Sequence, residues 1–369
     1  SREQAFLRTP EHYNRNGISF FAGEEVTLVD PNRKEVRTRK GSVFFYRQLL
    51  ISAGGRVKPW RVEGSETTPF FRLHTIDDAD QIREAILGTR MPGMALVGGG
   101  FITLEILNAL AGHDMPLHVF MPEARYWEQF LDPDGSAFLE THMELAGITL
   151  HREEVIRMIT WKEKSNSIVI YTNRQYTHEA GVLAVGIGLD RELFPFTGIG
   201  IETNRGIKTN EYLETAVKDI WAAGDIAEHY HPIFQKHLLV GNWNNAFLQG
   251  RAAGLNMADR KLHNTNGQPF SALPLYSIDV LGLHISFLGD ASSNPDTDRV
   301  ESRQYAARFK RAIFYERFIM KEGRLVGAIL MNKFDDRHVI ERLIRSQQDV
   351  TSYLSFFADS SIHLSESII

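Results

Sequence analysis

The chain contains no cysteine among its 369 residues. This absence excludes disulfide frameworks, cysteine nucleophiles, zinc–thiolate sites and iron–sulfur clusters. Any redox chemistry must therefore use a bound organic cofactor, or a metal held by other ligands. A chain without cysteine fits a reducing compartment, and we expect a cytoplasmic protein.

Long hydrophobic runs and an excess of positive charge are also missing. No run of about 18 apolar residues occurs, so the sequence predicts no membrane-spanning helix. Lys and Arg number 41 against 46 Asp and Glu, a net charge of −5, which argues against nucleic acid as a partner. Apolar residues make up 43% of the chain, which is enough for a core, and the length allows about two to three domains.

Motifs of several common enzyme classes are absent as well. We find no GxxxxGK[ST] phosphate loop, no HExxH zinc motif and no GxSxG nucleophile elbow. Three histidines, His229, His231 and His237, lie close together, and the first two can hold a metal from one loop. No nearby carboxylate pattern completes a ligand set, so we predict no metal site.

The sequence predicts alternating strands and helices, followed by a region of antiparallel strands. The first section is rich in strands, with two short ones in residues 18–30 separated at Gly23. We expect helices at 77–88, 101–112, 134–146, 243–258 and 337–346, and strands at 48–52, 94–97, 117–121, 168–171, 182–185 and 220–223. The last hundred residues predict strands at Tyr276–Leu288, Ala312–Glu316, Phe318–Lys321 and Leu325–Met331.

A run of three glycines directly follows the strand predicted at 94–97. Gly98 permits a tight turn, and Gly100 lets the backbone approach a pyrophosphate at the N-terminus of the next helix. Thr103 replaces the third glycine of the GxGxxG pattern, so we expect the helix to pack less closely against the sheet. Strand, turn, helix and second strand stand in the order of a dinucleotide-binding β–α–β unit. The alternative is a structural turn without a ligand.

An acidic residue stands where such a unit needs one for the adenosine ribose. Glu123 lies 123 − 103 = 20 residues after Thr103, just past the second strand. A carboxylate there favours NAD over NADP, because it would repel a 2′-phosphate. Arg125, two residues later, can reverse that preference.

Two further turns carry weaker signals. Residues 51–56, ISAGGR, end a strand in small residues that permit a close approach. Residues 220–228, IWAAGDIAE, deliver Asp225 at the end of a short apolar strand, where it can accept hydrogen bonds from sugar or polyol hydroxyls. The alternative for Asp225 is the cap of a surface turn. We expect Asn242 to cap the following helix, and Ala246, Gly250 and Gly254 to form a smooth face that packs on a sheet.

Together these motifs resemble the two-dinucleotide-domain flavoprotein reductases, in the branch of apoptosis-inducing factor, monodehydroascorbate reductase and the rubredoxin and ferredoxin reductases. The resemblance is carried by Ser52-Ala53-Gly54, Gly98–Glu105, VFMPEARYW at 119–127, Gly224-Asp225, NNAFLQGRAAGLNM at 244–257 and LVGAILMNK at 325–333. It implies an α/β fold with two interleaved Rossmann-like domains, the first incomplete in this chain, and an α+β C-terminal domain with an antiparallel sheet. The implied division is 1–76 and 191–266 for FAD, 77–190 for NAD(P) and 267–369 for a C-terminal interface domain.

The resemblance also implies a cofactor set and an activity. It implies FAD and a nicotinamide cofactor, with NAD(H) more expected than NADP(H), and hydride transfer from nicotinamide to flavin. Electrons would then leave for an external protein or small molecule, without an active-site disulfide. Glu105 is the implied catalytic residue, near the nicotinamide, and Asp225 would contact the ribitol of FAD. The implied cofactor-binding residues are Gly98, Gly99, Gly100, Phe101, Ile102, Glu123, Ala53, Gly54, Gly186, Gly224, Asp225, Asn242, Trp243 and Ala246.

Three departures from the family pattern are visible. The family's first strand–GxGxxG–helix unit, which binds the ADP half of FAD, does not occur in this sequence. We expect a second chain or a cleaved, retained segment to supply it; a truncated chain and lost FAD binding are the alternatives. Gly241 stands where relatives often have Glu, and Ser277 where some have an aromatic residue over the flavin.

Two other functions stay open at this point. A non-enzymatic nucleotide-binding or assembly module would keep the reductase fold and use the C-terminal sheet for association. A flavin-free NAD dehydrogenase would need its own acid–base pair, and we find no convincing His–Asp arrangement for one. Many relatives use the C-terminal domain as a dimer interface, so the resemblance leaves a homo-oligomer open, and the sequence does not settle the oligomeric state.

Overall fold

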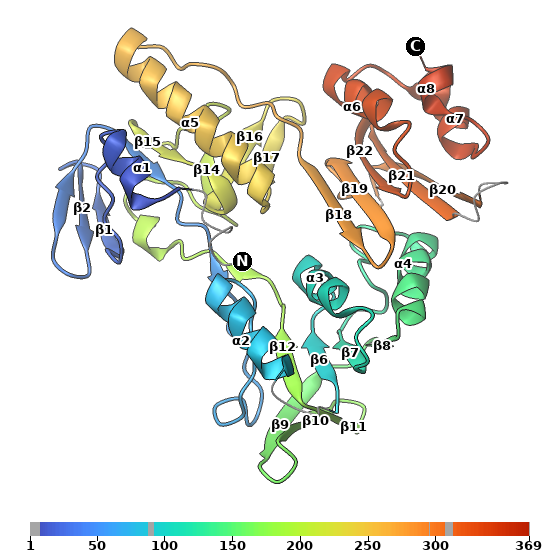
Figure 1. Cartoon of the computed structure of the whole chain (residues 1–369). Helices are drawn as coiled ribbons and strands as arrows, with labels where there is room; N and C mark the ends of the chain where they lie inside the picture. The colour runs from blue at the N-terminus through green and yellow to red at the C-terminus, as the bar shows by residue number, and fades with distance from the viewer. Residues whose placement is uncertain (1–7, 88–91, 295, 307–312, 369) are drawn as a thin grey trace. The chain divides into compact units, whose positions relative to one another are not determined.

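The computed structural model describes residues 8–87, 92–294, 296–306 and 313–368. The chain forms two compact units (Figure 1). The first contains the chain up to Gly55 together with Arg191–Phe270, and the second contains Arg56–Asp190 together with the chain from Ser271 onward. The predicted helix end at residue 88 and the predicted strand start at residue 312 lie outside the described residues. The four-part division of the chain stays a prediction.

The first unit consists of small sheets and one long helix. Its elements are α1 (Pro10–Arg15), β1 (Val26–Asp30), β2 (Glu35–Thr38), β3 (Val43–Phe45), β4 (Leu49–Ile51), β14 (Ile207–Thr209), β15 (Ile220–Ala222), β16 (Ala227–His231), β17 (Lys236–Leu239) and α5 (Trp243–His263). The β1–β2 turn forms because the Asp30 carboxylate accepts hydrogen bonds from the backbone N–H groups of Asn32 and Arg33. Strands β4 and β15 pair in parallel, so their carboxyl ends meet at one sheet edge.

The predicted strand within residues 18–22 is absent, and only β1 forms in the 18–30 segment. Phe20 and Phe21 are each 58% exposed, and Tyr13 stacks on Phe20. The aromatic residues of this segment therefore follow the short helix α1 as irregular chain, and hydrophobicity alone did not make a strand.

Helix α5 begins where predicted but packs with a different face. The Asn242 side chain caps it by accepting from the N–H of Asn245. The buried positions are Asn245, Gln249, Ala253 and Asn256, whereas Gly254 is exposed. The predicted packing face of small residues is therefore wrong. The buried amides are tolerated because each hydrogen-bonds a backbone group: Val240 O, Gly224 N and Tyr212 O respectively.

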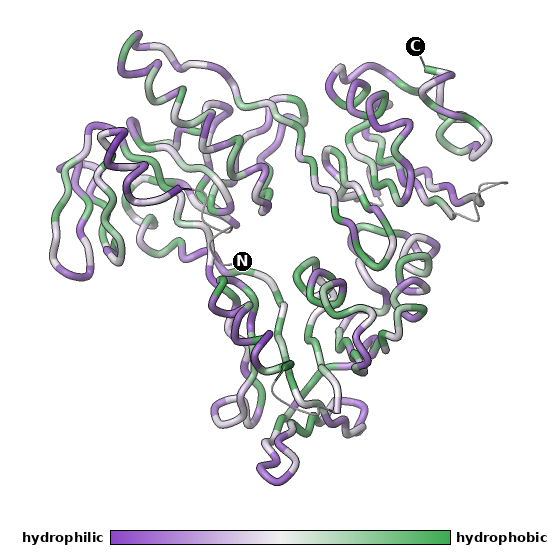
Figure 2. The backbone as a smooth tube through the Cα atoms, in the orientation of Figure 1, coloured by the Kyte–Doolittle hydropathy of each residue, from purple (hydrophilic) through white to green (hydrophobic). Residues whose placement is uncertain are grey.

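The second unit is built around a four-stranded parallel sheet of order β12-β6-β7-β8. The elements before Asp190 are β5 (Arg56–Val57), α2 (Ile76–Leu87), β6 (Met94–Val97), α3 (Phe101–Leu110), β7 (Leu117–Phe120), α4 (Pro133–Leu145), β8 (Ile148–His151), β9 (Ile156–Lys162), β10 (Ser167–Thr172), β11 (Thr177–Ala180), β12 (Val182–Val185) and β13 (Leu189–Asp190). The adjacent strands β6 and β12 are hydrophobic along their length (Figure 2), as expected for a parallel sheet covered on both faces. Strands β9, β10 and β11 form a separate antiparallel sheet.

The C-terminal part of the second unit is a five-stranded antiparallel sheet of order β18-β19-β22-β21-β20. Its elements are β18 (Leu275–Val280), β19 (Leu283–Gly289), β20 (Arg299–Ala306), β21 (Ile313–Lys321), β22 (Arg324–Met331), α6 (Arg337–Ser346), α7 (Leu354–Ala358) and α8 (Leu364–Ser367). The two strands predicted at 312–316 and 318–321 are one continuous strand, β21, with an irregularity between Ile319 and Met320. Parallel and antiparallel sheets together confirm the predicted fold class.

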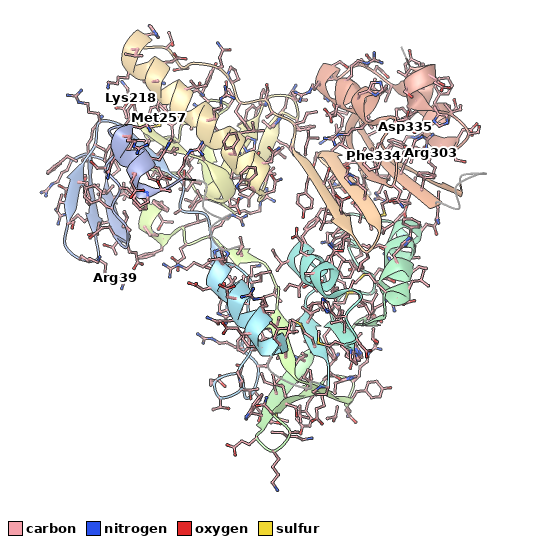
Figure 3. All side chains as sticks on the ribbon, in the orientation of Figure 1. Arg39, Lys218, Met257, Arg303, Phe334 and Asp335 are labelled. Atoms are coloured by element: carbon pink, nitrogen blue, oxygen red, sulfur yellow. The ribbon has the colours of Figure 1, made fainter. Side chains whose placement is uncertain are left out.

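A buried ion pair ties the last helices to this sheet. Arg303, labelled in Figure 3, donates to the Glu316 carboxylate at 2.7 Å and to the backbone carbonyls of Phe356, Asp359 and Ile362. Burial raises the pKa of Glu316, although the neighbouring Arg303 acts to lower it.

Among the described residues, no helix combines the length and apolar character that crossing a bilayer requires.

Candidate nucleotide-binding site

Gly98 makes the turn from β6 to α3 and leaves no room for a side chain. Its φ of +107° is in the region that favours glycine, and a Cβ there would lie 2.5 Å from the carbonyl oxygen of Gly186. The Gly98 N–H donates to Phe120 O at 2.9 Å, so the turn is joined to the end of β7. The sequence prediction of a tight turn at Gly98 therefore has a direct steric reason.

Gly186 compensates for the missing third glycine of the motif. Thr103 is fully buried, and a Cβ on Gly186 would lie 2.9 Å from the Thr103 hydroxyl. The side chain on α3 is thus accommodated by a glycine after β12. Thr103 was expected to make α3 pack less closely on the sheet, and the absence of a side chain at Gly186 offsets this effect.

Gly100 is the N-cap of α3 and has open space around it. Its φ is −102°, and it provides no side chain to cap the helix. The nearest atom to an added Cβ would be Gly186 O at 3.7 Å, and Tyr126 donates its hydroxyl proton to the Gly100 carbonyl at 2.8 Å. The first N–H groups of α3 therefore have room for an anion near a backbone without side chains.

Glu123 lies beside this turn with a buried carboxylate oxygen that has no hydrogen-bond partner. A Cβ at Gly99 would lie 3.7 Å from that same Oε2 atom. A buried acceptor without a donor costs free energy, and a ribose diol would supply the donors. The Arg125 Nε is likewise buried without a partner. The residues present thus fit the adenosine side of a nicotinamide dinucleotide.

A hollow of about 230 Å³ lies next to the start of α3 and the end of β12. Ile102 and Gly186, two of the predicted residues, line it. The rest of the lining was not predicted from the sequence and consists of Val57, Lys58, Leu73, His74, Thr75, Val185, Ile187, Gly188 and Leu189. These residues come from segments before α2 and after β12, and no local motif connects them.

Glu105 and Phe101 take different positions on α3. Glu105 is exposed and accepts a hydrogen bond from the Tyr276 hydroxyl of β18 at 3.1 Å. Burial and the Glu105 carboxylate raise the pKa of Tyr276, so this tyrosine stays protonated and donates the proton of this hydrogen bond. Phe101 packs in an aromatic cluster with Trp127, Tyr276 and Phe287. Its role as a cofactor contact stays a prediction.

The first unit holds a second turn pair at the carboxyl ends of β4 and β15. Ala53 and Gly54 follow β4, and Gly224 and Asp225 follow β15, where Ala223 N–H donates to Ile51 O at 3.0 Å. Gly54 and Gly224 have φ values of +63° and +80°. Apart from its chain neighbours, no described residue has an atom within 4 Å of a Cβ placed on Gly54, which leaves room for a ligand at this turn.

The start of α5 lies against the same turn pair. A Cβ on Gly224 would lie 3.5 Å from Ala246 Cβ, and one on Gly241 would lie 3.5 Å from the Asp225 carboxylate. Arg191 donates to the Asp225 carbonyl. Trp243 is 66% exposed and stacks on Phe247. A carboxylate, open glycine backbone and a helix N-terminus at one sheet edge fit the polyol and phosphate parts of FAD.

Two polar residues support this turn: Gln249, which the sequence did not reveal, and His229, which was considered there only as a metal ligand. Gln249 accepts from the Gly224 N–H at 2.8 Å and contacts the Nδ1 atom of buried His229 at 3.0 Å. Burial, followed by the neighbouring His231, lowers the pKa of His229 to about 3. A neutral imidazole is therefore present at pH 7. The signal that could have revealed Gln249 is the spacing of amides at 245, 249 and 256 along one helix face.

Comparison with known proteins is consistent with both turns. A model described as pyridine nucleotide-disulphide oxidoreductase matches residues 2–250. The seedling isozyme of monodehydroascorbate reductase from Cucumis sativus is 30% identical over 221 residues, which are 59% of this chain and 51% of that protein. The chain thus spans about half the length of that relative. An NADH-rubredoxin oxidoreductase from Clostridium acetobutylicum is 26% identical over 82% of this chain and 72% of its own length.

Solved structures show the same fold. In the covalent putidaredoxin reductase–putidaredoxin complex, the similar chain has a TM-score of 0.86 and 23% identity; the match covers 100% of this chain and 85% of that one. The family match spans well over half of the chain and includes both glycine turns, so the resemblance identified from the sequence is confirmed. The chain belongs to the pyridine nucleotide-disulphide oxidoreductase family.

Proposed function

We propose that this protein is an FAD-dependent NAD(P)H oxidoreductase that prefers NADH and passes electrons to an external acceptor. The observation that carries this proposal is the buried, unpartnered Oε2 of Glu123 beside Gly99. Its position at the end of β7, next to the N-terminus of α3, is where a ribose diol is bound in a dinucleotide fold.

Each turn has a defined task in this proposal. The backbone from Gly98 to Gly100 and the first N–H groups of α3 bind the nicotinamide cofactor's pyrophosphate, and Glu123 accepts hydrogen bonds from its adenosine ribose. Asp225 accepts hydrogen bonds from the ribitol of FAD, with Asn242, Trp243 and Ala246 at the helix beside it. When bound, the two cofactors supply hydride donation and acceptance, so the protein contributes orientation and exclusion of water.

We propose Glu105 as the catalytic residue next to the nicotinamide. Its hydrogen bond from Tyr276 fixes the carboxylate on the surface of α3, and this polar pair is positioned to orient the carboxamide. A matched test compares Glu105→Gln with Glu128→Gln, which also changes an exposed glutamate of this unit. We expect only the former to slow flavin reduction.

The acceptor in this proposal is outside the chain. Without cysteine, the polypeptide has no thiol pair to take electrons from the flavin. One relative is named for rubredoxin, and another for monodehydroascorbate. A small redox protein and a small-molecule radical are therefore the two acceptor classes to test.

Anaerobic reduction of the full-length protein tests this function. We expect purified protein to carry flavin absorption that bleaches when NADH is added under nitrogen and returns when an acceptor is supplied. Nucleotide binding without bleaching in stopped-flow traces would contradict the proposal and favour a nucleotide-binding module instead. Protein that takes up no FAD would also contradict it.

The cofactor preference has its own test at Glu123. We expect Glu123→Ala to weaken NADH binding by about 10- to 100-fold, the effect of losing charged hydrogen bonds of roughly 1.5–3 kcal/mol. NADPH binding should change less, because the carboxylate no longer repels its 2′-phosphate. Glu123→Gln, which keeps the shape and removes the charge, is the matched control. Equal losses for both nucleotides in Glu123→Ala would remove this residue from the site.

A further inference from the structure

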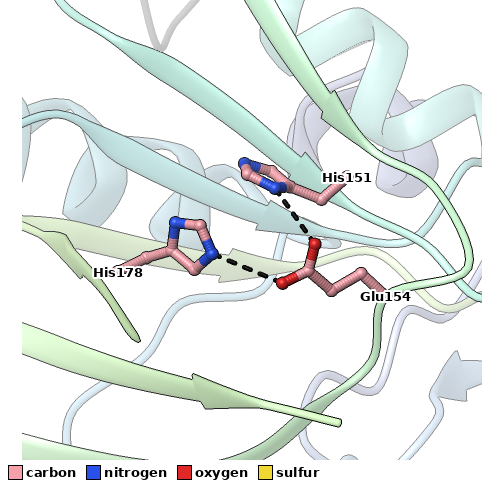
Figure 4. A group of neighbouring side chains, drawn as sticks. All are labelled: His151, Glu154 and His178. Atoms are coloured by element: carbon pink, nitrogen blue, oxygen red, sulfur yellow. Dashed lines mark hydrogen bonds and ion pairs between the residues drawn. The ribbon is translucent and has the colours of Figure 1, made fainter. Parts of the chain in front are cut away.

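Three side chains from separate segments of the second unit converge at one place that the sequence analysis did not identify. They are His151 at the end of β8, Glu154 in the following loop and His178 on β11 (Figure 4). Each offers one ligand atom, and these atoms all lie within 4.8 Å of one another. Two imidazoles and one carboxylate form a common ligand set for a transition metal.

The contacts among the three side chains are long enough to leave room for a shared ion. His151 Nδ1 lies 3.3 Å from Glu154 Oε2, and His178 Nε2 lies 3.4 Å from Glu154 Oε1. Charged N–H···O hydrogen bonds are typically shorter, about 2.7–2.9 Å. Ligands about 2.0–2.1 Å from a tetrahedral zinc ion are separated from each other by about 3.4 Å. The separation of His151 Nδ1 from Glu154 Oε2 matches that edge length, and one ligand atom from each of the three residues lies within 4.8 Å of the other two.

Neighbouring residues hold the three ligands in place. Thr172 donates its hydroxyl proton to Glu154 Oε1 at 2.7 Å, and the Nε2 atom of His151 lies 3.0 Å from Nδ1 of His118. The buried ring of Phe120 stacks on His151 with centroids 4.3 Å apart. Such outer contacts fix the tautomer and orientation of metal-binding histidines. With Nε2–H of His151 donating to His118, its Nδ1 lone pair points to Glu154.

Charge and burial also suit a cation. The Glu154 side chain is 4% exposed. Burial by itself would raise the pKa of its carboxyl, but the hydrogen bond from Thr172 and the contacts with the two histidines together lower that pKa. Burial and the neighbouring His178 lower the pKa of His151, which keeps its imidazole neutral near pH 7. The cluster thus combines one buried carboxylate with two imidazoles, each of which offers one nitrogen.

We propose that His151, Glu154 and His178 bind one divalent transition-metal ion of the zinc class. The fourth position belongs to water, because His118 faces His151 and no further described ligand completes the group. The His178 side chain is 23% exposed, so an ion can enter from solvent. The ion would join β8, the following loop and β11, which belong to two different sheets. Mg²⁺ and Ca²⁺ prefer all-oxygen ligand sets and should not bind.

Cobalt titration of the metal-free, nucleotide-free full-length protein tests the proposal, using material without a histidine tag. We expect one equivalent of Co²⁺ to bind with the visible absorption bands of four-coordinate cobalt, and Zn²⁺ to displace it. Glu154→Gln, which can still accept from Thr172, and His178→Gln should each weaken binding by about 100-fold or more. Thr172→Val, which removes an outer contact, should weaken it by about 10- to 100-fold. His113→Gln changes an exposed histidine of the same unit and should bind Co²⁺ like the unchanged protein.

Two results would overturn the proposal. One is the absence of saturable Co²⁺ binding, with Zn²⁺ calorimetry also silent. The other is binding that persists unchanged in folded His178→Gln protein, which would place the ion elsewhere. His178 lies on an edge strand and is partly exposed, so this variant keeps its fold even if Glu154→Gln does not. Circular dichroism of each variant verifies this point.

Discussion

The two glycine turns of this protein differ in how the chain builds them. In the second unit, β6, the turn at Gly98, α3 and Glu123 form one continuous segment. In the first unit, Gly54 and Asp225 are 225 − 54 = 171 residues apart in sequence, and the pairing of β4 with β15 brings their turns to one edge. A continuous site can be identified from spacing alone, whereas a divided one depends on knowing which strands pair.

The turns also differ in how much space surrounds their glycines. Gly98 is enclosed, because Gly186 O would lie 2.5 Å from an added Cβ, whereas Gly54 has no neighbour within 4 Å. Glycine at 98 is thus required by the packing of the folded chain, whether or not a ligand is bound. Glycine at 54 is favoured by its φ of +63° and, in our proposal, by the approach of a ligand.

The largest expected effect concerns the divided turn. We expect Asp225→Ala to abolish FAD retention, because the carboxylate that accepts hydrogen bonds from the ribitol is lost. Flavin absorbance relative to protein absorbance in purified material measures this. Asp259→Ala, which removes a carboxylate on α5 of the same unit, is the control and should keep its flavin. Unchanged flavin content in Asp225→Ala would mean that the first unit holds FAD differently or not at all.

The contrast between enclosed and open glycines gives a stability prediction. Gly54→Ala should lower the free energy of unfolding by about 1–2 kcal/mol, the cost of a left-handed conformation. Gly98→Ala carries a similar cost, and its clash with a backbone carbonyl adds about 1–3 kcal/mol. Denaturant titrations of both variants measure the difference. Equal losses of unfolding free energy in the two variants would show that the Gly98 turn can relax to accept a side chain. The two turns would then not differ in how tightly their glycines are enclosed.

Much of the fold could be predicted because its local signals agree. Strand β6, the glycine turn and α3 follow one another with clear boundaries, and α6 matches its prediction at 337–346. Errors arose where one signal stood alone. Hydrophobic residues at 18–22 suggested a strand that no neighbour pairs with, and the small residues of α5 suggested a packing face. The actual face buries amides, which only tertiary hydrogen bonds to the backbone make favourable.

The site was predictable to the extent that it is local. The positions of Gly98 and Glu123 relative to each other follow from the length of a β–α–β unit. Gly186 was implied only by the family resemblance, and its contact with Thr103 depends on β12 lying beside β6. The ligand cluster of His151 and His178 was missed for the same reason, since β8 and β11 belong to different sheets.

The pH dependence of stability gives a further test of the first unit. The folded pKa of His229, about 3, lies below the value of about 6.5 expected in the unfolded chain. Below pH 6.5 the unfolded state therefore binds a proton that the folded state does not, and stability falls as the pH drops, by up to roughly 1.4 kcal/mol per pH unit. His229→Asn, which keeps an acceptor for Gln249, should flatten this slope. Urea titrations at about pH 7, 6 and 5 measure it, and an identical slope in the variant would contradict the assignment.

The smallest expected effect separates ligand binding from structure at the continuous turn. Gly100 has an ordinary φ of −102° and open space around it, so Gly100→Ala should cost no more than about 1 kcal/mol of stability, the loss of a favourable N-cap. Its methyl group would occupy the space through which a pyrophosphate approaches the α3 N-terminus. Binding of ADP-ribose should therefore weaken by at least about tenfold, or ~1.4 kcal/mol, while adenosine, which lacks the pyrophosphate, binds as before. Calorimetry with both ligands measures this. If ADP-ribose bound equally well to the variant, the open space at Gly100 would serve no ligand, and the two turns would differ in function as well as in construction.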